Sequence, residues 1–347
     1  METEGHPTPP PTELGPGALR ALELLQRGKR FVLTGHMRPD GDCIGAQAAL
    51  ARVLEGLGKD VWIVNPDPAE KRFEYLARDV RYRAFDGGAL PEHDVSVLLD
   101  FSELSRTGAM AEPLARASSK KLVIDHHLHH GEAWWDEAFV DTGAAATGLL
   151  VLRIARALGV EIDPVAARGV FTSLVTDTGW FKYSNTDAET LTAAGEMIAL
   201  GADPSEIYSA LYQRRSHLHP LGIARLLART EYLAGRRLAL VDQPLSEAVD
   251  ADAVDTDEVL DVLRSVGSVE VVLYLRELAD GTCKLSARSK GAYDVNALAR
   301  AFGGGGHRKA SGATIPGPID AVRPRLVAAA IAGFDDPPRE RSASAGR

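Results

Sequence analysis

The sequence is poor in cysteine, in net positive charge and in long hydrophobic runs, and each shortage excludes a class of protein. Its 347 residues include two cysteines, Cys43 and Cys283, far apart in the chain. They form neither a disulfide framework nor a metal–thiolate motif, and such usage suits a reducing compartment such as the cytoplasm. The formal net charge is −9, so the protein as a whole is not a sequence-independent polyanion binder. Any nucleic acid must be held locally.

Membrane association is not expected either. No stretch approaches the roughly 20 consecutive apolar residues that a membrane span needs. The first residues contain Glu2, Glu4 and several prolines, without the basic and apolar segments of a secretory signal. We therefore expect a cytoplasmic protein without a membrane partner. The hydrophobic fraction of 45% indicates a globular chain, and the length suggests two domains.

Apolar runs and helical patterns alternate over the first half of the chain. Strands are predicted at 30–34, 60–65, 95–100 and 121–125, and helices at 19–27, 45–58, 69–78, 103–117 and 146–158. This alternation is typical of an α/β fold, a mostly parallel sheet with flanking helices. From Pro164 to about Thr230 the pattern is nearly all helical.

Strand patterns return after this helical region, at 232–233, 237–241, 269–276 and 283–287, with helices at 295–302 and 319–332. They predict a smaller α+β domain. We expect a disordered segment at 1–16, a catalytic metal-binding domain at 17–215, a helical linker at 216–230, a substrate-binding domain at 231–335 and a disordered tail at 336–347.

The turn after the first predicted strand carries one histidine and two aspartates, His36, Asp40 and Asp42. Open α/β sheets place their active sites at the carboxyl ends of the strands. Because Pro39 and Gly41 disfavour a helix, Asp40 and Asp42 are expected on an extended loop, where residues two apart point to the same side.

Further acidic residues and histidines follow later apolar runs: Asp100, Asp125, His126, His127 and Asp177. A single aspartate at such a place is usually a cap or turn residue. Burying all of them together without cations would be prohibitive, and two divalent cations would supply the missing charge. Oxygen and imidazole ligands favour Mn²⁺, with Mg²⁺ or Co²⁺ as alternatives, over a thiolate-bound Zn²⁺.

These motifs, in this order, resemble the DHH phosphoesterase superfamily over residues 18–335. The resemblance implies that one metal is held by His36, Asp40 and Asp100. It implies that the second is held by Asp42, Asp100, His126 and Asp177, so that Asp100 bridges the two ions. His127 would face the substrate and transfer a proton, a role that suits an imidazole at neutral pH. Asp125 would support the histidines.

A second informative segment is glycine-rich and spans 303–312. Its four consecutive glycines, followed by His307, Arg308 and Lys309, permit close backbone approach and anion binding by amides. Together with the preceding Arg288 and Ser289, the segment resembles the DHHA1 domain of one superfamily branch. The resemblance implies that the substrate is contacted by Arg288, Ser289, Gly304, Gly305, Gly306, His307 and Arg308.

Several functions remain open within the resemblance. The first is an enzyme of the nanoRNase/pAp-phosphatase type, which would hydrolyse RNAs of two to five nucleotides, linear dinucleotides such as pApA and 3′-phosphoadenosine 5′-phosphate (pAp), and which in some relatives opens cyclic di-AMP. The alternatives are a single-strand exonuclease of RecJ type, a family II inorganic pyrophosphatase and an inactive nucleotide-binding regulator. Long duplex nucleic acid is not an expected partner. Relatives are often homodimers, and the sequence is compatible with that state.

Overall fold

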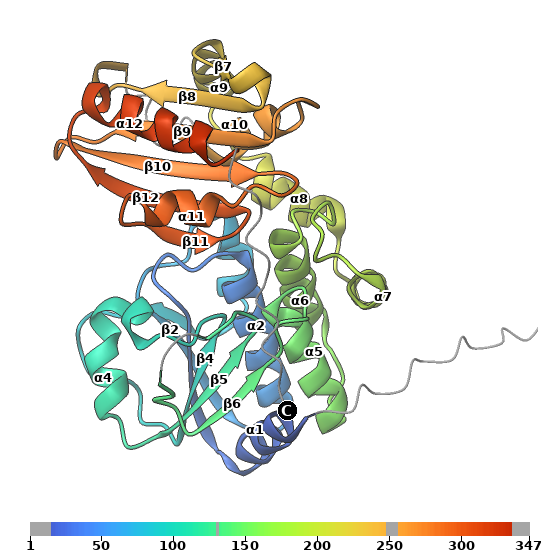
Figure 1. The fold of residues 1–347 in the computed structure, drawn as a ribbon. Helices are drawn as coiled ribbons and strands as arrows, with labels where there is room; N and C mark the ends of the chain where they lie inside the picture. The colour runs from blue at the N-terminus through green and yellow to red at the C-terminus, as the bar shows by residue number, and fades with distance from the viewer. Residues whose placement is uncertain (1–14, 130–131, 248–255, 335–347) are drawn as a thin grey trace, which may run out of the picture. The chain divides into compact units, whose positions relative to one another are not determined.

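The computed structural model describes residues 15–129, 132–247 and 256–334, and the chain divides into two compact units between Arg214 and Arg215 (Figure 1). The segments expected to be disordered, 1–16 and 336–347, lie outside the described residues, apart from Gly15 and Pro16. Pro16 opens the first helix, where a proline at the first position costs no hydrogen bond.

The first unit is built on a six-stranded sheet in which every neighbouring pair is parallel. The strand order is β3-β2-β1-β4-β5-β6. Their bounds are β1 (Arg30–Thr34), β2 (Asp60–Asn65), β3 (Tyr82–Ala84), β4 (Val95–Leu99), β5 (Lys120–Asp125) and β6 (Glu137–Val140). The α/β prediction is confirmed. The edge strands β3 and β6 were not predicted, because runs of three and four residues are too short to show a period.

Helices cover both faces of this sheet, since alternate strand residues point to opposite sides. Phe31 and Leu33 pack with α1 (Pro16–Arg27), α2 (Gly41–Gly56), α5 (Thr147–Leu158) and α6 (Pro164–Asp177) in the main core. Val32 packs on the other side with Leu114 of α4 (Ala111–Arg116) (Figure 1). The other described helices of the unit are η1 (Lys71–Phe73), α3 (Glu74–Ala77), η2 (Leu104–Met110), α7 (Ala188–Ala199) and α8 (Pro204–Tyr212).

Glycines let α2 and α6 approach each other at backbone distance. A Cβ atom on Gly45 would lie 2.4 Å from the carbonyl oxygen of Gly169, and one on Gly169 would lie 2.6 Å from that of Gly45. Any side chain at either position would push the helices apart. This contact matters because both helices carry residues of the site described below.

The second unit has its own six-stranded sheet, in the order β11-β12-β10-β9-β8-β7, in which only the β8–β9 pair is parallel. Its elements are α9 (His219–Ala228), β7 (Glu231–Leu233), η3 (Ala234–Arg236), β8 (Leu238–Gln243), η4 (Leu245–Glu247), α10 (Thr256–Arg264), β9 (Val271–Glu277), β10 (Thr282–Ser289), α11 (Val295–Arg300), β11 (Gly305–His307), β12 (Ala310–Pro316) and α12 (Ile319–Ala332). The core on one face contains residues of α11 and α12, and the core on the other contains residues of α9 and α10.

Two features of this unit differ from what the sequence predicts. The glycine-rich segment is not an open loop throughout, because Gly305–His307 forms an edge strand paired with β12. The segment 216–230, treated above as a linker, folds with the second unit, since Leu226 of α9 is buried in its core.

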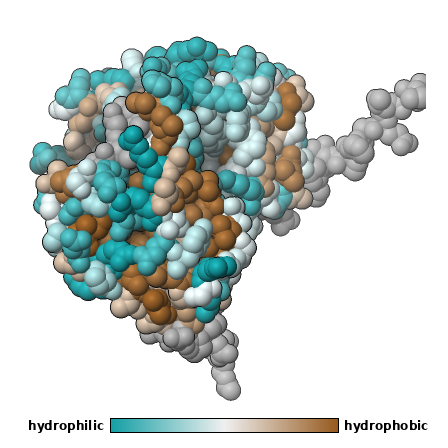
Figure 2. Space-filling view, turned by 90° about the horizontal axis from the view of Figure 1, so that it is seen from above, coloured by the Kyte–Doolittle hydropathy of each residue, from teal (hydrophilic) through white to brown (hydrophobic). Residues whose placement is uncertain are grey.

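No helix among the described residues is long and apolar enough to cross a bilayer. On the face drawn in Figure 2, hydrophilic and hydrophobic residues are interspersed.

Candidate metal centre

The site lies where the strand order of the first sheet reverses. β1 and β4 are neighbours, and the chain leaves them toward opposite edges of the sheet, which opens a crevice outside their carboxyl ends. His36 follows β1 by two residues, and Asp100 follows β4 directly. Asp100 has a φ of 69°, a left-handed conformation that is costly for a residue with a side chain.

Asp40 has the extended backbone that the sequence predicts, but Asp42 does not, and this part of the sequence interpretation is wrong. α2 begins at Gly41, so Asp40 is its N-cap and accepts a hydrogen bond from the Cys43 amide at 3.1 Å. Asp42 belongs to the first helical turn. The proline and glycine that suggested a loop instead mark the helix start, because both are tolerated there.

Three donors far away in sequence orient the Asp42 carboxylate. It accepts hydrogen bonds from the amides of Thr147, at 2.8 Å, and Gly148, at 3.2 Å, and from the Ser173 hydroxyl. Thr147 also donates to Asp100 at 3.2 Å. Sequence reasoning missed Thr147, Gly148 and Ser173, because a lone hydroxyl or amide carries no signal until the fold brings it to a carboxylate.

Asp177 comes from a helix, in the region that the sequence predicts to be nearly all helical. It is the last residue of α6. The next turn is left-handed at three consecutive residues, Gly179, Trp180 and Phe181, with φ values of 56°, 60° and 64°. The Trp180 ring packs against Tyr208, with centroids 5.0 Å apart. This packing offsets the backbone strain that ends the helix at Asp177.

Backbone carbonyls set the orientation of two imidazoles. Nδ1 of His36 lies 2.8 Å from the Met37 carbonyl, and Nδ1 of His126 lies 3.2 Å from the Ala144 carbonyl. A carbonyl can only accept, so Nδ1 carries the proton and Nε2 presents a lone pair. Nε2 of His126 is buried and has no hydrogen-bond partner among the described residues.

The two Nε2 atoms face carboxylates in two groups. Nε2 of His36 lies 3.8 Å from Asp40 and 3.6 Å from Oδ2 of Asp100.

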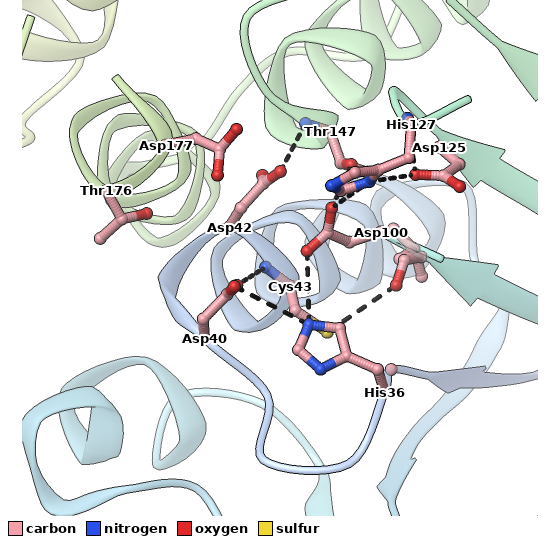
Figure 3. Close-up of polar contacts among 12 residues, drawn as sticks. His36, Asp40, Asp42, Cys43, Asp100, Asp125, His127, Thr147, Thr176 and Asp177 are labelled. Carbon is pink, nitrogen blue, oxygen red and sulfur yellow. Dashed lines mark hydrogen bonds and ion pairs between the residues drawn. The ribbon is translucent and has the colours of Figure 1, made fainter. Parts of the chain in front are cut away.

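Nε2 of His126 lies 3.5 Å from Asp42, 3.6 Å from Oδ1 of Asp100 and 3.3 Å from Asp177. Asp100 thus offers one oxygen to each group. Figure 3 shows Asp42, Asp100 and His36 converging from α2, β4 and β1. The structure brings together all six residues for which the sequence predicts metal binding.

This arrangement is electrostatically incomplete without cations. Burial, and then the charges of Asp42 and Asp40, raises the pKa of Asp100 well above its usual range. The same causes raise the pKa of Asp177. Burial lowers the pKa of His36, which keeps its imidazole neutral and able to act as a ligand. Lone pairs that face carboxylates, an orphaned imidazole nitrogen and crowded carboxyl groups together fit divalent cations.

Cys43 is a further side chain of a metal-binding type in the centre. It stands close to His36 and Asp100, is fully buried, and its thiol lies 3.8 Å from the Leu99 carbonyl. Burial raises the pKa of this thiol well above its usual range. A protonated thiol is a poor ligand, so its packing role is favoured.

His127 and Asp125 form a pair beside the carboxylates. Nδ1 of His127 donates to Oδ1 of Asp125 at 2.8 Å, and the His127 amide donates to the same oxygen at 3.1 Å. Burial acts to raise the pKa of Asp125, but the hydrogen bonds and charge of His127 outweigh it, and the net pKa is lowered. Asp125 therefore holds the His127 ring in one orientation.

A buried amide network supports the loop that carries His36. Asn65 accepts a hydrogen bond from the Gly35 amide at 2.7 Å and exchanges hydrogen bonds with Gln47 at 2.8 Å in both directions. A Cβ on Gly35 would lie 2.1 Å from the Cys43 sulfur. The sequence shows nothing of this network, since its members lie on β2 and α2.

In the second unit, some of the predicted substrate-binding residues line a hollow of about 510 Å³. Arg288 and Gly304 to Gly306 are among its lining residues. Ser289 is buried, and its hydroxyl donates to the Tyr293 carbonyl, so it holds a turn and does not face the hollow. His307 is exposed on β11, and Arg308 donates to the Ala292 carbonyl at 2.9 Å. These last two residues do not line the hollow.

Comparison with known proteins finds a family match in each of the two units. Residues 30–175 match the DHH family, N-terminal domain, and residues 243–334 match the DHHA1 domain. A bifunctional oligoribonuclease and PAP phosphatase NrnA of Thermus thermophilus is 32% identical over 86% of this chain and 86% of that protein. The protein of that name in Bacillus subtilis is 26% identical over 82% and 89%.

Among solved structures, an exopolyphosphatase-related protein from Bacteroides fragilis superposes with a TM-score of 0.84 at 25% identity, over 92% of this chain and 96% of that one. The resemblance inferred from the motifs is thus confirmed over nearly the entire length, and the protein belongs to the DHH superfamily, in the branch that carries a C-terminal DHHA1 domain.

Proposed function

We propose that the protein is a two-metal phosphoesterase that hydrolyses short oligoribonucleotides of two to five residues, linear dinucleotides such as pApA, and pAp to nucleoside monophosphates. The observation that carries the proposal is the pair of imidazole Nε2 atoms facing carboxylates that share Asp100. The relatives named as oligoribonuclease and PAP phosphatase support this substrate class. Cyclic di-AMP is a further candidate.

Two divalent cations, Mn²⁺ in our proposal, would neutralise phosphate charge and lower the pKa of a water molecule toward neutrality. His36, Asp40 and Asp100 would hold one cation. Asp42, Asp100, His126 and Asp177 would hold the other. The distances within each group, 3.3 to 3.8 Å between Nε2 and the oxygens, support this division.

The chain's own residues have separate tasks in this proposal. Asp125 fixes the ring of His127 through Nδ1, so that the opposite nitrogen can give a proton to the departing alkoxide. Thr147, Gly148 and Ser173 hold the Asp42 carboxylate in place. In the second unit, Arg288 and the backbone of Gly305 and Gly306 would bind a substrate phosphate. The Gly304 amide already donates to the Ala299 carbonyl at 2.9 Å.

The deciding experiment is a substrate panel in Mn²⁺, with chelator as control. It contains pApA, pAp, cyclic di-AMP, a long single-stranded RNA and pyrophosphate. AMP released from pApA or pAp, with little action on the last two, is the expected result. Processive digestion of the long strand would favour an exonuclease of RecJ type, and fast pyrophosphate cleavage would favour a pyrophosphatase. Binding without turnover of any substrate would indicate a regulator.

Asp177→Asn is the better inactive control. Asp42 accepts three hydrogen bonds inside the core, so its replacement by an amide would leave a donor facing donors and disturb folding. The Asp177 side chain is 30% exposed, so its amide is tolerated. Activity of Asp177→Asn equal to that of the wild type would contradict the two-metal proposal.

A further inference from the structure

The second sheet carries a row of polar side chains, of which the proposed function uses only Arg288. Along β10, Lys284, Ser286 and Arg288 alternate with buried Leu285 and Ala287, so the three point to one face. All three are among the residues that line the hollow.

Neighbouring strands extend this row. Thr314 of β12 stands opposite Lys284 on one side, and Arg276 of β9 stands opposite it on the other. Residues directly opposite each other in an antiparallel pair point to the same face of the sheet. Two cations and a hydroxyl therefore stand together at Lys284, one step along the strand from Ser286 and two from Arg288.

The same face is apolar on its other half. Over β8 and β9, Val241, Val272 and Tyr274 pack in a core with Leu226 of α9 and Leu260 of α10. That hydrophobic packing does not continue to β10 and β12, where cations and glycines line the hollow. The face thus changes from a covered core to a solvent-accessible polar surface.

The floor of the hollow is bare backbone, and packing requires its glycines. A Cβ on Gly304 would lie 2.1 Å from the carbonyl oxygen of Gly312. One on Gly306 would lie 2.7 Å from that of Ala310, and the φ of Gly306 is 135°. A ligand can therefore lie flat on the strands, with the basic side chains along its length.

We propose that Lys284, with Arg276 and Thr314, forms a second phosphate subsite that engages the additional phosphate of substrates longer than a dinucleotide. This inference rests on the proposed function. Alternate residues of a strand are about 6.6–6.8 Å apart, a step of the same order as one nucleotide of an extended chain. Lys284 lies two such steps from Arg288, so Arg288 holds one phosphate and the Lys284 subsite holds a phosphate about two nucleotides further along the chain.

Arg288 is not blocked by its existing ion pair. It donates to Asp257 at 2.7 Å, but the Asp257 side chain is 71% exposed. Exposed ion pairs contribute little, so a phosphate can displace the carboxylate. The Lys284 subsite then adds contacts that only the longer substrate makes.

The test compares 5′-phosphorylated di- and pentaadenylate as substrates of the wild type and of Lys284→Gln combined with Arg276→Gln. The ratio of kcat/KM for the pentamer to that for the dimer is expected to fall about tenfold. Each neutralised phosphate contributes about 0.7 to the logarithmic salt dependence of single-strand binding. The salt slope for the pentamer should therefore fall by about 0.7 to 1.4 in the double variant.

Two controls separate this subsite from general charge effects. Arg300 is exposed on α11, which packs against the opposite face of the sheet, so Arg300→Gln should leave the ratio unchanged. Lys284→Arg keeps the positive charge, so this variant should retain most of the wild-type pentamer-to-dimer ratio.

An unchanged pentamer-to-dimer ratio in the double variant would overturn the inference. Failure of the proposed function is a distinct outcome, in which the wild type cleaves neither oligonucleotide. The subsite is still decided in that case, by equilibrium binding of the two labelled oligonucleotides in chelator, where the double variant should lose affinity for the pentamer selectively.

Discussion

The carboxylates at the centre of the first unit are costly residues that the fold nevertheless buries. Asp42 and Asp100 are almost completely inaccessible to solvent, and the raised pKa of Asp100 reflects both burial and its charged neighbours. Groups of this kind destabilise the protein until a cation balances them. Their burial therefore indicates a role in cation binding and not a contribution to the stability of the metal-free protein.

This cost leads to a prediction for Asp177→Asn. In chelator, the variant should be more stable than the wild type, by on the order of 1 kcal/mol, because one of several crowded carboxylates becomes neutral. In Mn²⁺ the order should reverse, since the wild type binds the cation more tightly. Urea unfolding in both buffers measures this. A variant less stable than the wild type in chelator would show that the carboxylates do not destabilise the metal-free protein by mutual repulsion.

The difference in the free energy of unfolding between Asp177→Asn and the wild type in chelator should also depend on pH. The folded-state pKa of Asp177 is raised, so the metal-free wild type gains stability as the pH falls through that pKa, whereas the asparagine variant does not. The stability difference between the two proteins should therefore shrink as the pH falls through the raised pKa of Asp177. Because the charge of Asp177 also raises the pKa of Asp100, the difference reports on both carboxyl groups together.

Asp125→Asn addresses the orientation of His127. Loss of the carboxylate weakens the hydrogen bond that fixes the ring, and substitutions at such supporting positions typically cost 10–100-fold in activity or metal affinity. We expect kcat for pApA to fall in about that range, while KM and Mn²⁺ affinity change little. A loss confined to Mn²⁺ affinity would place Asp125 in metal support instead.

At the scale of elements, the site depends on how closely two helices approach. α2 supplies Asp42 and α6 supplies Asp177, and the helices touch through Gly45 and Gly169. The spacing of these two proposed metal ligands thus depends on the absence of a side chain about one helical turn from Asp42 and about two turns from Asp177. His126 completes the same group from the turn after β5.

Gly45→Ala should separate the two helices. The added methyl would lie 2.4 Å from the Gly169 carbonyl oxygen, so we expect a loss of about 1–3 kcal/mol in the free energy of unfolding. Mn²⁺ affinity should fall as well, because Asp42 and Asp177 move apart. Calorimetric titration of Mn²⁺ and urea unfolding measure the two effects.

The matched control is Gly195→Ala, at an exposed position of α7. A Cβ there meets nothing within 4 Å, and the helix should gain about 0.5–1 kcal/mol from the substitution. Equal destabilisation of both variants would argue against a specific contact at Gly45.

At the scale of the whole molecule, the two units have separate cores and separate proposed sites. All six proposed metal ligands belong to the first unit, and the hollow with its basic residues belongs to the second. Each unit buries its own sheet under its own helices.

Metal addition should therefore protect one unit selectively. Ligands bound to the native state stabilise it by about 2.7 kcal/mol at a hundred times the dissociation constant. Hydrogen exchange should slow in Mn²⁺ at the ends of β1, β4 and α6, with little change in β9 and β10. Equal protection of both sheets would mean that the two units unfold together.

The sequence by itself determined the family, the parallel sheet and the identity of the proposed metal ligands. Strands 30–34 and 60–65 match the structure residue for residue, because periodicity and β-branched composition are local properties. The proposed site was recognisable because His36, Asp40 and Asp42 stand within seven residues, and Asp125 to His127 within three. Short strands such as β3 and β6, whose pairing is not local, escaped detection.

Only the tertiary structure decided how these residues act. It placed Asp42 in a helical turn and Asp177 at a helix end, and it supplied Thr147, Gly148 and Ser173 as donors from more than 100 residues away. It also turned the glycine-rich segment into an edge strand beside a row of cations. Hydrogen bonds, burial and helix contacts between distant segments arise from packing, and no local pattern in the chain encodes them.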